Sequence, residues 1–422
     1  MTKSRFRIKD KLFYGWVVVI ASSIIGIIVF GTRYSFGVFF KSLASEFGLT
    51  RAETSGVFSI YMLLCSVFAI ICGWAVDKYG PKIIASIMGL FAGLSLLLTS
   101  QANSLWQLFI VYSFLLAIGT GGVYVVRTSI ITRWFVKKRG LAIGISTSGS
   151  GLGTVIMAPF ATYLIGNFGW RMASIVMGLI AWLSIIPMAM LLRKEPDEMG
   201  LMPDGAEPNE GRTRGSDLME GGIRPAGFSL SQAFQTRNFW CLGFSWLLFS
   251  SCVSMILTHI VPHSTDIGIS AMKAATILSL ISAVSILGRL LVGRISDRMG
   301  RKMTAIVCVL LLAVAMIWLI WSKDLWMFYL FAVVFGFFYG GFDTSTGALI
   351  GDIFGLRNIG IIMGTLSVGW SLGAAIGSAI GGLIYDVCKN YSVAFSIGVV
   401  TMLIATLLLA LIRQVTNLDR ST

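Results

Sequence analysis

The chain has 422 residues, of which 56% are hydrophobic and only 12% are charged, whereas about 25% of the residues of an ordinary globular protein are charged. This balance excludes a soluble domain. The net charge of +14 would suit a nucleic-acid partner, but the basic residues cluster between apolar stretches, and this placement argues for a lipid bilayer and against nucleic acid.

Twelve apolar stretches are each long enough to cross a bilayer as a helix, which takes about 20 residues. We therefore expect an all-α membrane protein with twelve transmembrane helices. No cleavable signal pattern precedes the first of them. The expected spans are 13–40, 54–76, 82–101, 104–131, 140–166, 170–192, 239–265, 271–294, 303–322, 325–351, 359–385 and 391–412.

The distribution of Lys and Arg predicts the orientation. With a cytoplasmic N-terminus, 24 basic residues lie on the cytoplasmic side, six on the outer side and three within the membrane. Basic residues favour the cytoplasmic side, so we expect both termini there, in a multi-pass protein of a bacterial inner membrane.

One long polar segment, residues 193–237, follows the sixth span. It predicts a cytoplasmic linker between two six-helix halves, residues 1–192 and 238–422. We expect its middle to be mobile because it is rich in Gly, Pro, Glu and Arg. Residues 228–239 are expected to form a short amphipathic helix on the membrane surface.

A repeated motif, G-x-x-x-D-[KR]-x-G-x-K, occupies residues 73–82 and 293–302. The two copies fall at the same place in each half, which indicates duplicated halves. Their aspartates, Asp77 and Asp297, are expected to act in gating loops that lock neighbouring helices in one state and release them in another. The motif resembles the signature loop of the major facilitator superfamily. This resemblance implies a substrate site between the halves, near the middle of the bilayer.

Further short motifs recur in a specific order along nearly the whole chain. They are YGWV at 14–17, YSFGVF at 34–39, RWF at 133–135, KRGLA at 138–142, EPDEMGLMPDG at 195–205, HIVPH at 259–263, GR at 288–289 and DIFG at 352–355. The set resembles bacterial relatives of the monocarboxylate transporters and of the oxalate–formate antiporter. The resemblance implies an organic-anion carrier, often a proton symporter for lactate or pyruvate and otherwise an anion exchanger.

Three arginines, Arg33, Arg127 and Arg289, lie within predicted spans. A charge there costs about 2.5–3.5 kcal/mol on insertion scales, and it is tolerated where it faces a watery cavity or a partner. Arginine also suits the bidentate binding of a carboxylate. The three residues therefore predict an internal anion site. Each arginine also has a structural interpretation. Arg289 could form an ion pair between helices, Arg33 could snorkel to the headgroups, and Arg127 could pair with a carboxylate or a backbone carbonyl.

The resemblance implies that Arg289 binds the substrate carboxylate. The sequence departs from the family at several places. Ser285 stands where mammalian monocarboxylate carriers have an aspartate, and Arg33 is the neighbour of the position, near Tyr34, where they have a basic residue. The span 359–385 lacks the lysine of the oxalate antiporter, and Arg127 matches no residue of the family.

Asp343 is the one carboxylate that we place well within a span. It is interpreted either as the proton site of a symporter or as a fixed counter-ion for Arg289 or Arg127. If a substrate anion takes over the arginine, protonation of Asp343 becomes more favourable, and this links the two fluxes. Aromatic residues complete the predicted site: hydroxyl donors at Tyr34 and Tyr124, and cavity-lining rings at Tyr339 and Trp370.

The favoured function is proton-coupled symport of a small monocarboxylate by a monomeric carrier. The excess of three arginines over one aspartate supports the alternatives, which are anion exchange or transport of a dicarboxylate, tricarboxylate or sulfonate. A receptor that senses an acid is a third hypothesis, but the linker contains no recognisable output domain. The sequence shows no P-loop, no nucleophile–base pair and no clustered metal ligands, so we expect neither an enzyme nor a cofactor.

Overall fold

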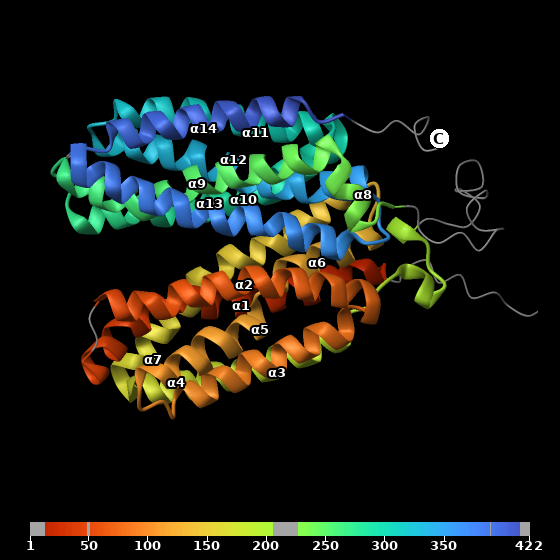
Figure 1. Ribbon diagram of the computed structural model, residues 1–422, viewed down its shortest axis with the longest axis horizontal. Helices are drawn as coiled ribbons and strands as arrows, with labels where there is room; N and C mark the ends of the chain where they lie inside the picture. Colours follow the sequence, from red (N-terminus) through yellow and green to blue (C-terminus); the bar gives the residue numbers. More distant parts are fainter. Residues whose placement is uncertain (1–12, 49–50, 206–226, 389, 414–422) are drawn as a thin grey trace, which may run out of the picture.

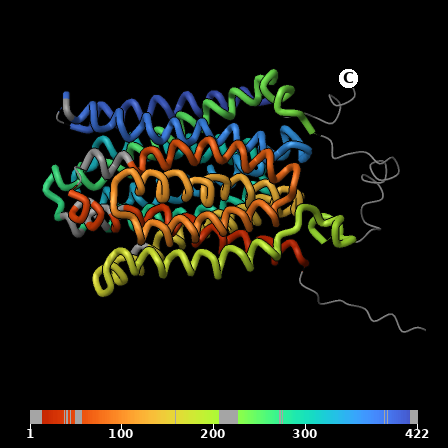
Figure 2. Tube along the Cα trace, turned by 60° about the horizontal axis from the view of Figure 1, so that its bottom comes forward, coloured from red at the N-terminus to blue at the C-terminus, as the bar shows by residue number. Residues whose placement is uncertain are grey.

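The computed structural model describes residues 13–48, 51–205, 227–388 and 390–413, and nearly all of them are helical (Figure 1). The middle of the linker, for which we expected mobility, lies outside these described residues. Figure 2 shows that the start of α1, the first linker turns after α7 and the end of α14 all lie at one end of the bundle. We call this end the linker end.

The described helices follow the predicted spans closely. The first part of the chain contains α1 (Tyr14–Phe47), α2 (Arg51–Tyr79), α3 (Pro81–Thr99), α4 (Leu105–Leu108), the π-helix η1 (Phe109–Leu115), α5 (Leu116–Thr120), α6 (Val123–Trp134) and α7 (Arg139–Met190). Two short 3-10 turns and a short helix belong to the linker: η2 (Pro196–Met199), η3 (Pro203–Gly205) and α8 (Leu230–Gln235). The second part contains α9 (Arg237–Asp266), α10 (Ala271–Met299), α11 (Arg301–Ile320), α12 (Leu325–Phe354), α13 (Ile359–Cys388) and α14 (Ser392–Ala410).

Helix α7 contains two spans. Its 52 residues would extend roughly 78 Å at 1.5 Å per residue, far beyond a hydrocarbon core of roughly 30 Å. Gly169 interrupts it with φ 79° and ψ 162°, nearly the same conformation as Gly80 between α2 and α3. Glycine tolerates this positive φ because it has no Cβ. Eleven helices among the described residues are long and apolar enough to cross a membrane, and this break raises the number of spans to the predicted twelve.

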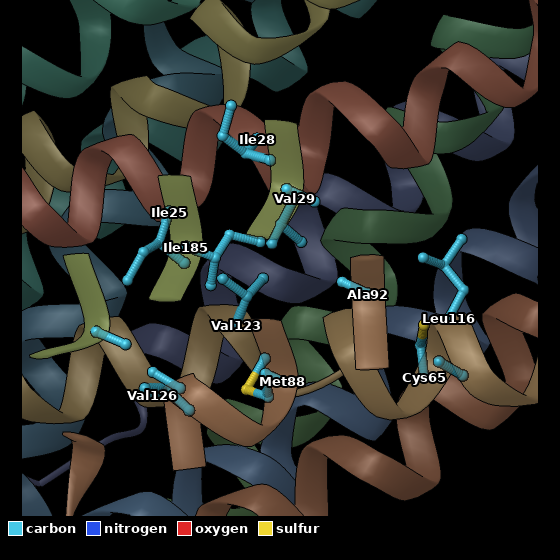
Figure 3. Close-up of a cluster of buried hydrophobic side chains, with 14 of the residues drawn as sticks. Ile25, Ile28, Val29, Cys65, Met88, Ala92, Leu116, Val123, Val126 and Ile185 are labelled. Atoms are coloured by element: carbon cyan, nitrogen blue, oxygen red, sulfur yellow. The ribbon is translucent and has the colours of Figure 1, made fainter. Parts of the chain in front are cut away.

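The buried apolar side chains form two separate clusters. The first is contributed almost entirely by α1 to α7, and the second almost entirely by α9 to α14. Figure 3 shows part of the first cluster, in which Ile25, Val29, Met88, Val123 and Ile185 from different helices point toward one another. In Figure 1 the two bundles meet at the linker end and diverge toward the other end. The protein is thus an all-α membrane protein with two six-helix halves.

Two elements differ from the sequence prediction. The fourth span is not one uniform helix, because η1 has the rare i→i+5 pattern and Gly121–Gly122 separates α5 from α6. The predicted surface helix over 228–239 is wrong in its length: α8 ends at Gln235. Thr236 is extended there, and its side chain accepts a hydrogen bond from the backbone N–H of Phe239, so it caps α9 and begins a new helix.

Candidate functional site

Arg289 and Asp343 lie side by side in the second half. The Nε of Arg289 is 3.7 Å from Oδ2 of Asp343, and the two side chains are 6% and 15% exposed. At this distance they form an ion pair without a hydrogen bond. Arg289 Nη1 instead donates to Ser285 Oγ over 3.0 Å, while Nε has no hydrogen-bond partner among the described residues. The pair therefore keeps donor capacity for an anion.

Close packing of α10 on α12 brings this pair together. A Cβ on Gly288 would lie 2.0 Å from the carbonyl oxygen of Phe337, and one on Gly340 would lie 2.1 Å from that of Ser285. Only glycine permits these approaches between the two backbones. The ring of Tyr339, one position before Gly340, lies under the Arg289 guanidinium with 5.4 Å between its centroid and Cζ.

Arg127 lies in the first half and is 3% exposed. Its Nη1 donates to the backbone carbonyl of Ser146 on α7 over 3.2 Å, which agrees with the alternative of a carbonyl partner. Gly26 leaves room for the guanidinium, because a Cβ there would lie 2.4 Å from Nη1. The Asp343 carboxylate of the second half also acts electrostatically on Arg127. Asp343 thus forms an ion pair with Arg289 and also lies within electrostatic range of an arginine of the opposite half.

Arg33 is held within the first half. Its Nε donates to the hydroxyl of Tyr61 over 3.0 Å, and Nη2 contacts Cys65 Sγ at 3.5 Å. The ring of Phe30 lies between two cations: its centroid is 5.1 Å from Cζ of Arg33 and 5.0 Å from Cζ of Arg127. Arg33 is therefore anchored by residues of α2.

The structure brings two of the predicted aromatic residues, Tyr124 and Trp370, to the seam between the halves. The ring of Tyr124 on α6 packs edge-on against Trp246 on α9 at 5.9 Å, and Trp246 packs against Trp370 on α13 at 6.3 Å. The predicted Tyr34 stacks on Phe30 at 6.3 Å and is half-exposed. The site thus has a charged part around Arg289 and an aromatic part around Trp246.

A separate small cavity lies inside the first half. Ser22, Val123 and Arg127 are among its lining residues, and its volume is about 10 Å³. This volume holds about one water molecule and is far too small for an organic acid. Ser22 Oγ and Arg127 Nε both lack a protein partner among the described residues, so they suit such a water.

Asp77 and Asp297 each cap a helix of the opposite half. The carboxylate of Asp77, at the end of α2, accepts hydrogen bonds from the backbone N–H groups of Gly360 and Ile361 at the start of α13, at 3.2 and 3.0 Å. Asp297, at the end of α10, accepts from Gly140 and Leu141 at the start of α7, at 2.8 and 3.0 Å. We call these two interactions the crossed caps; a carboxylate is favourable at a helix N-terminus.

Glycines allow the crossed caps to form. A Cβ on Gly73 would lie 2.2 Å from the carbonyl oxygen of Gly360, and one on Gly293 would lie 2.5 Å from that of Gly140. The Gly of the repeated motif is therefore the point where each half touches the other, one helical turn before the capping aspartate. The linker end is closed in this structure.

Linker residues reinforce the closed end. Arg133 donates to Asp77 over 2.9 Å and to Glu195 over 2.7 Å, so it joins the end of α2 to the linker. The Asp204 carboxylate accepts from the backbone N–H groups of Val136 and Lys137, at 2.9 and 2.7 Å, just before α7. Part of the linker thus folds back onto the closed end.

Comparison with known proteins agrees with this architecture. The family model described as Major Facilitator Superfamily matches residues 22–301 and again residues 264–422. The chain belongs to the Major Facilitator Superfamily. Two solved structures share its fold. The proton:xylose symporter XylE has a TM-score of 0.73 and 13% identity, and the match covers 93% of this chain and 94% of that one. The Escherichia coli fucose:proton symporter FucP has a TM-score of 0.73 and 12% identity, and the match covers 96% of this chain and 100% of that one.

Relatives in sequence indicate the branch of the superfamily. Monocarboxylate transporter 12 of Xenopus laevis is 24% identical over 417 residues, which cover 97% of this chain and 90% of that protein. Monocarboxylate transporter 12 of Homo sapiens is 25% identical over 431 residues, covering 97% and 82%. The chain is thus a multi-pass membrane transporter related to the monocarboxylate transporters, and these homologues are transporters, not enzymes.

Sequence reasoning missed three contributors to the site. Trp246 and Phe30 had no distinguishing signal, because an aromatic residue in an apolar span usually faces lipid or the core. Ser285 was noted only as a departure from the family, yet its hydroxyl is the partner of Arg289. Arginine at i and serine at i−4 on one helix is a spacing that could have predicted this bond.

Proposed function

We propose that this transporter carries a small organic acid anion by alternating access, as a monomer, and that Arg289 binds the substrate carboxylate. The most favoured substrates are monocarboxylates such as lactate or pyruvate. One observation carries the proposal: a buried arginine whose Nε has no hydrogen-bond partner among the described residues, beside a carboxylate too distant to accept from it. The likeness to monocarboxylate transporters supports the same substrate class.

We place the linker end on the cytoplasmic side. The basic residues support this orientation, since 24 of 33 fall on the side of the termini and linker. The closed crossed caps then correspond to an outward-facing or occluded carrier. Residues 1–192 and 238–422 would move as two units joined by the linker 193–237, with Asp77 and Asp297 as the gating residues.

Asp343 supplies the proposed coupling to protons. When the substrate carboxylate binds Arg289, it replaces Asp343 as the counter-ion, and the carboxylate of Asp343 then gains less from staying ionised. A proton taken up there restores the charge balance and travels with the substrate. In proteoliposomes, added substrate should therefore acidify the lumen, and an uncoupler should abolish accumulation; uptake indifferent to both would contradict symport.

The variant Asp343→Asn tests this coupling. We expect it to retain exchange of labelled substrate across the membrane but to lose at least ~90% of uptake driven by a pH gradient, because the amide cannot take up the proton. Asp324→Asn is the matched control, at the residue that precedes the same helix: its side chain makes no capping hydrogen bond, so both activities should stay at the wild-type level. Unchanged gradient-driven uptake in Asp343→Asn would exclude Asp343 as the proton site.

Anion exchange is the second candidate function. The spans contain three buried or partly buried arginines, and only Arg289 forms an ion pair with a carboxylate there; this excess of positive charge favours exchange of one anion for another, or a substrate with more than one negative charge. A thermal-shift screen of purified protein against mono-, di- and tricarboxylates and sulfonates distinguishes these substrates, because a ligand that binds the folded state raises its apparent stability.

A further inference from the structure

The first part of the linker binds the turn between α6 and α7. The carboxylate of Asp204 accepts hydrogen bonds from three successive backbone N–H groups of this turn, those of Val136, Lys137 and Lys138, at 2.9, 2.7 and 3.3 Å. Asp204 has φ 59°, and no other non-glycine residue in the described part of the chain has a positive φ. This conformation is unfavourable for a residue with a Cβ, which indicates that the contacts with the turn stabilise it.

The same turn is also held by the second half. The backbone carbonyl of Val136 accepts a hydrogen bond from Nη2 of Arg301 at the start of α11, at 2.9 Å. Helix α7 begins three residues after Val136, and Asp297 caps the backbone N–H groups of Gly140 and Leu141 there. The linker therefore binds the N–H of Val136 while the second half binds its carbonyl, immediately before a helix N-terminus that belongs to a crossed cap.

The last part of the linker makes the corresponding contact with the turn between α12 and α13. The backbone N–H of Phe228 donates to the carbonyl of Phe354 over 2.9 Å, and the carbonyl of Phe228 accepts from Nδ2 of Asn358 at 3.1 Å. This turn leads directly into the N-terminus of α13, which Asp77 caps. The two ends of the linker thus bind the two turns that precede the two capped helices.

We propose that the linker is a working part of the gate, and that Asp204 and Phe228 are positioning residues that hold the two turns ready for the crossed caps. This inference rests on the proposed function, because it takes the crossed caps as the gate of an alternating-access carrier. Release of Asp204 from its turn biases the carrier toward the state that is open at the linker end.

The physical reason is the entropy of the two turns. A crossed cap needs backbone N–H groups that already point toward the carboxylate of the opposite half. A free turn would have to be ordered each time the halves close, and fixing the backbone of a residue costs conformational entropy. Asp204 binds a turn of its own half, and Phe228 binds a turn of the half that follows it, so both contacts persist when the halves separate.

Asp204→Gly tests the proposal, because glycine adopts the same positive φ without strain and removes only the carboxylate. We expect the ratio of molecules closed at the linker end to molecules open there to fall roughly 3- to 10-fold. The ratio is measured on purified full-length protein by pulsed electron resonance between spin labels at Lys82 and Arg298, both exposed. Asp204→Asn should restore most of the ratio, since asparagine tolerates this φ and keeps an oxygen acceptor.

Glu198→Gln is the matched control, since it removes an exposed carboxylate from the same part of the linker and should leave the ratio unchanged. Asn358→Ala removes the side chain that binds Phe228 and should lower the ratio independently. In the double variant with Asp204→Gly the two fold-changes should multiply, because the two turns lie in different halves.

Gly73→Ala, which crowds the contact between the halves directly, shows whether the labels report opening. If it lowers the ratio while Asp204→Gly and Asn358→Ala do not, the linker has no role in the gate and the proposal is overturned, although the gate itself stands. If none of the three variants changes the ratio, the crossed caps do not form the gate, and the proposed gating fails as well.

Discussion

Replacing Arg289 by lysine is expected to weaken substrate binding by roughly 30- to 100-fold, equivalent to about 2–3 kcal/mol. Lysine keeps the positive charge, but its ammonium group cannot form two parallel hydrogen bonds to a carboxylate. It would also lose the planar contact with Tyr339 and the bond to Ser285. Calorimetric titration of purified protein with the acid found in the thermal-shift screen measures the change.

Arg294→Lys is the control for this substitution. Arg294 lies five residues farther along the same helix and is exposed, so the exchange should leave affinity unchanged. Wild-type affinity in Arg289→Lys would exclude Arg289 as the carboxylate-binding residue, and the substrate would then have to bind at Arg127 or Arg33.

Gly73→Ala is expected to lower the ratio of molecules closed at the linker end to molecules open there by roughly tenfold. The new methyl group would lie 2.2 Å from the carbonyl oxygen of Gly360, which belongs to the backbone and cannot rotate away. Such overpacking costs about 1–3 kcal/mol, and ~1.4 kcal/mol corresponds to a tenfold change in the closed-to-open equilibrium ratio. Spin labels at the exposed positions Lys82 and Arg298, one in each half, should report a longer distance by pulsed electron resonance.

Two further variants sharpen this result. Gly293→Ala crowds the equivalent contact with Gly140 and should give the same opening. Gly166→Ala places a methyl group in open space within α7, so its distance distribution should match that of the wild type. If Gly73→Ala also kept the wild-type distribution, the close approach of the two glycines would not hold the halves together.

The sequence predicted the membrane spans well because a single physical requirement determines them. Each span must be apolar over about 20 residues, and the polar gaps between spans are short. The boundary between α8 and α9 was harder, because it depends on one extended residue, Thr236, within a segment whose composition suits a helix throughout. The π-helix in the fourth span has no compositional signal in the sequence.

The sequence predicted those site residues that carry a charge within an apolar span, because burying such a charge costs free energy. Arg289 and Asp343 stand out because an ionised side chain in an apolar span needs a partner, and a pairing between them was one of the two interpretations of Asp343. A carbonyl partner was one alternative for Arg127, but the individual partner residues of Arg33 and Arg127 were not predictable. Tyr61 is one of several tyrosines, and a backbone carbonyl such as that of Ser146 carries no signal in the sequence.

The crossed caps have a consequence for how the linker end opens. Each half supplies the carboxylate that the other half needs, so neither helix N-terminus is capped by its own half. Separation of the halves at this end breaks all four backbone hydrogen bonds in one event, because both caps lie at the same end. Opening should therefore be cooperative, with long dwell times in the closed state and no stable intermediate that keeps a single cap. In this proposal the duplicated motif would convert two local contacts into one two-state switch.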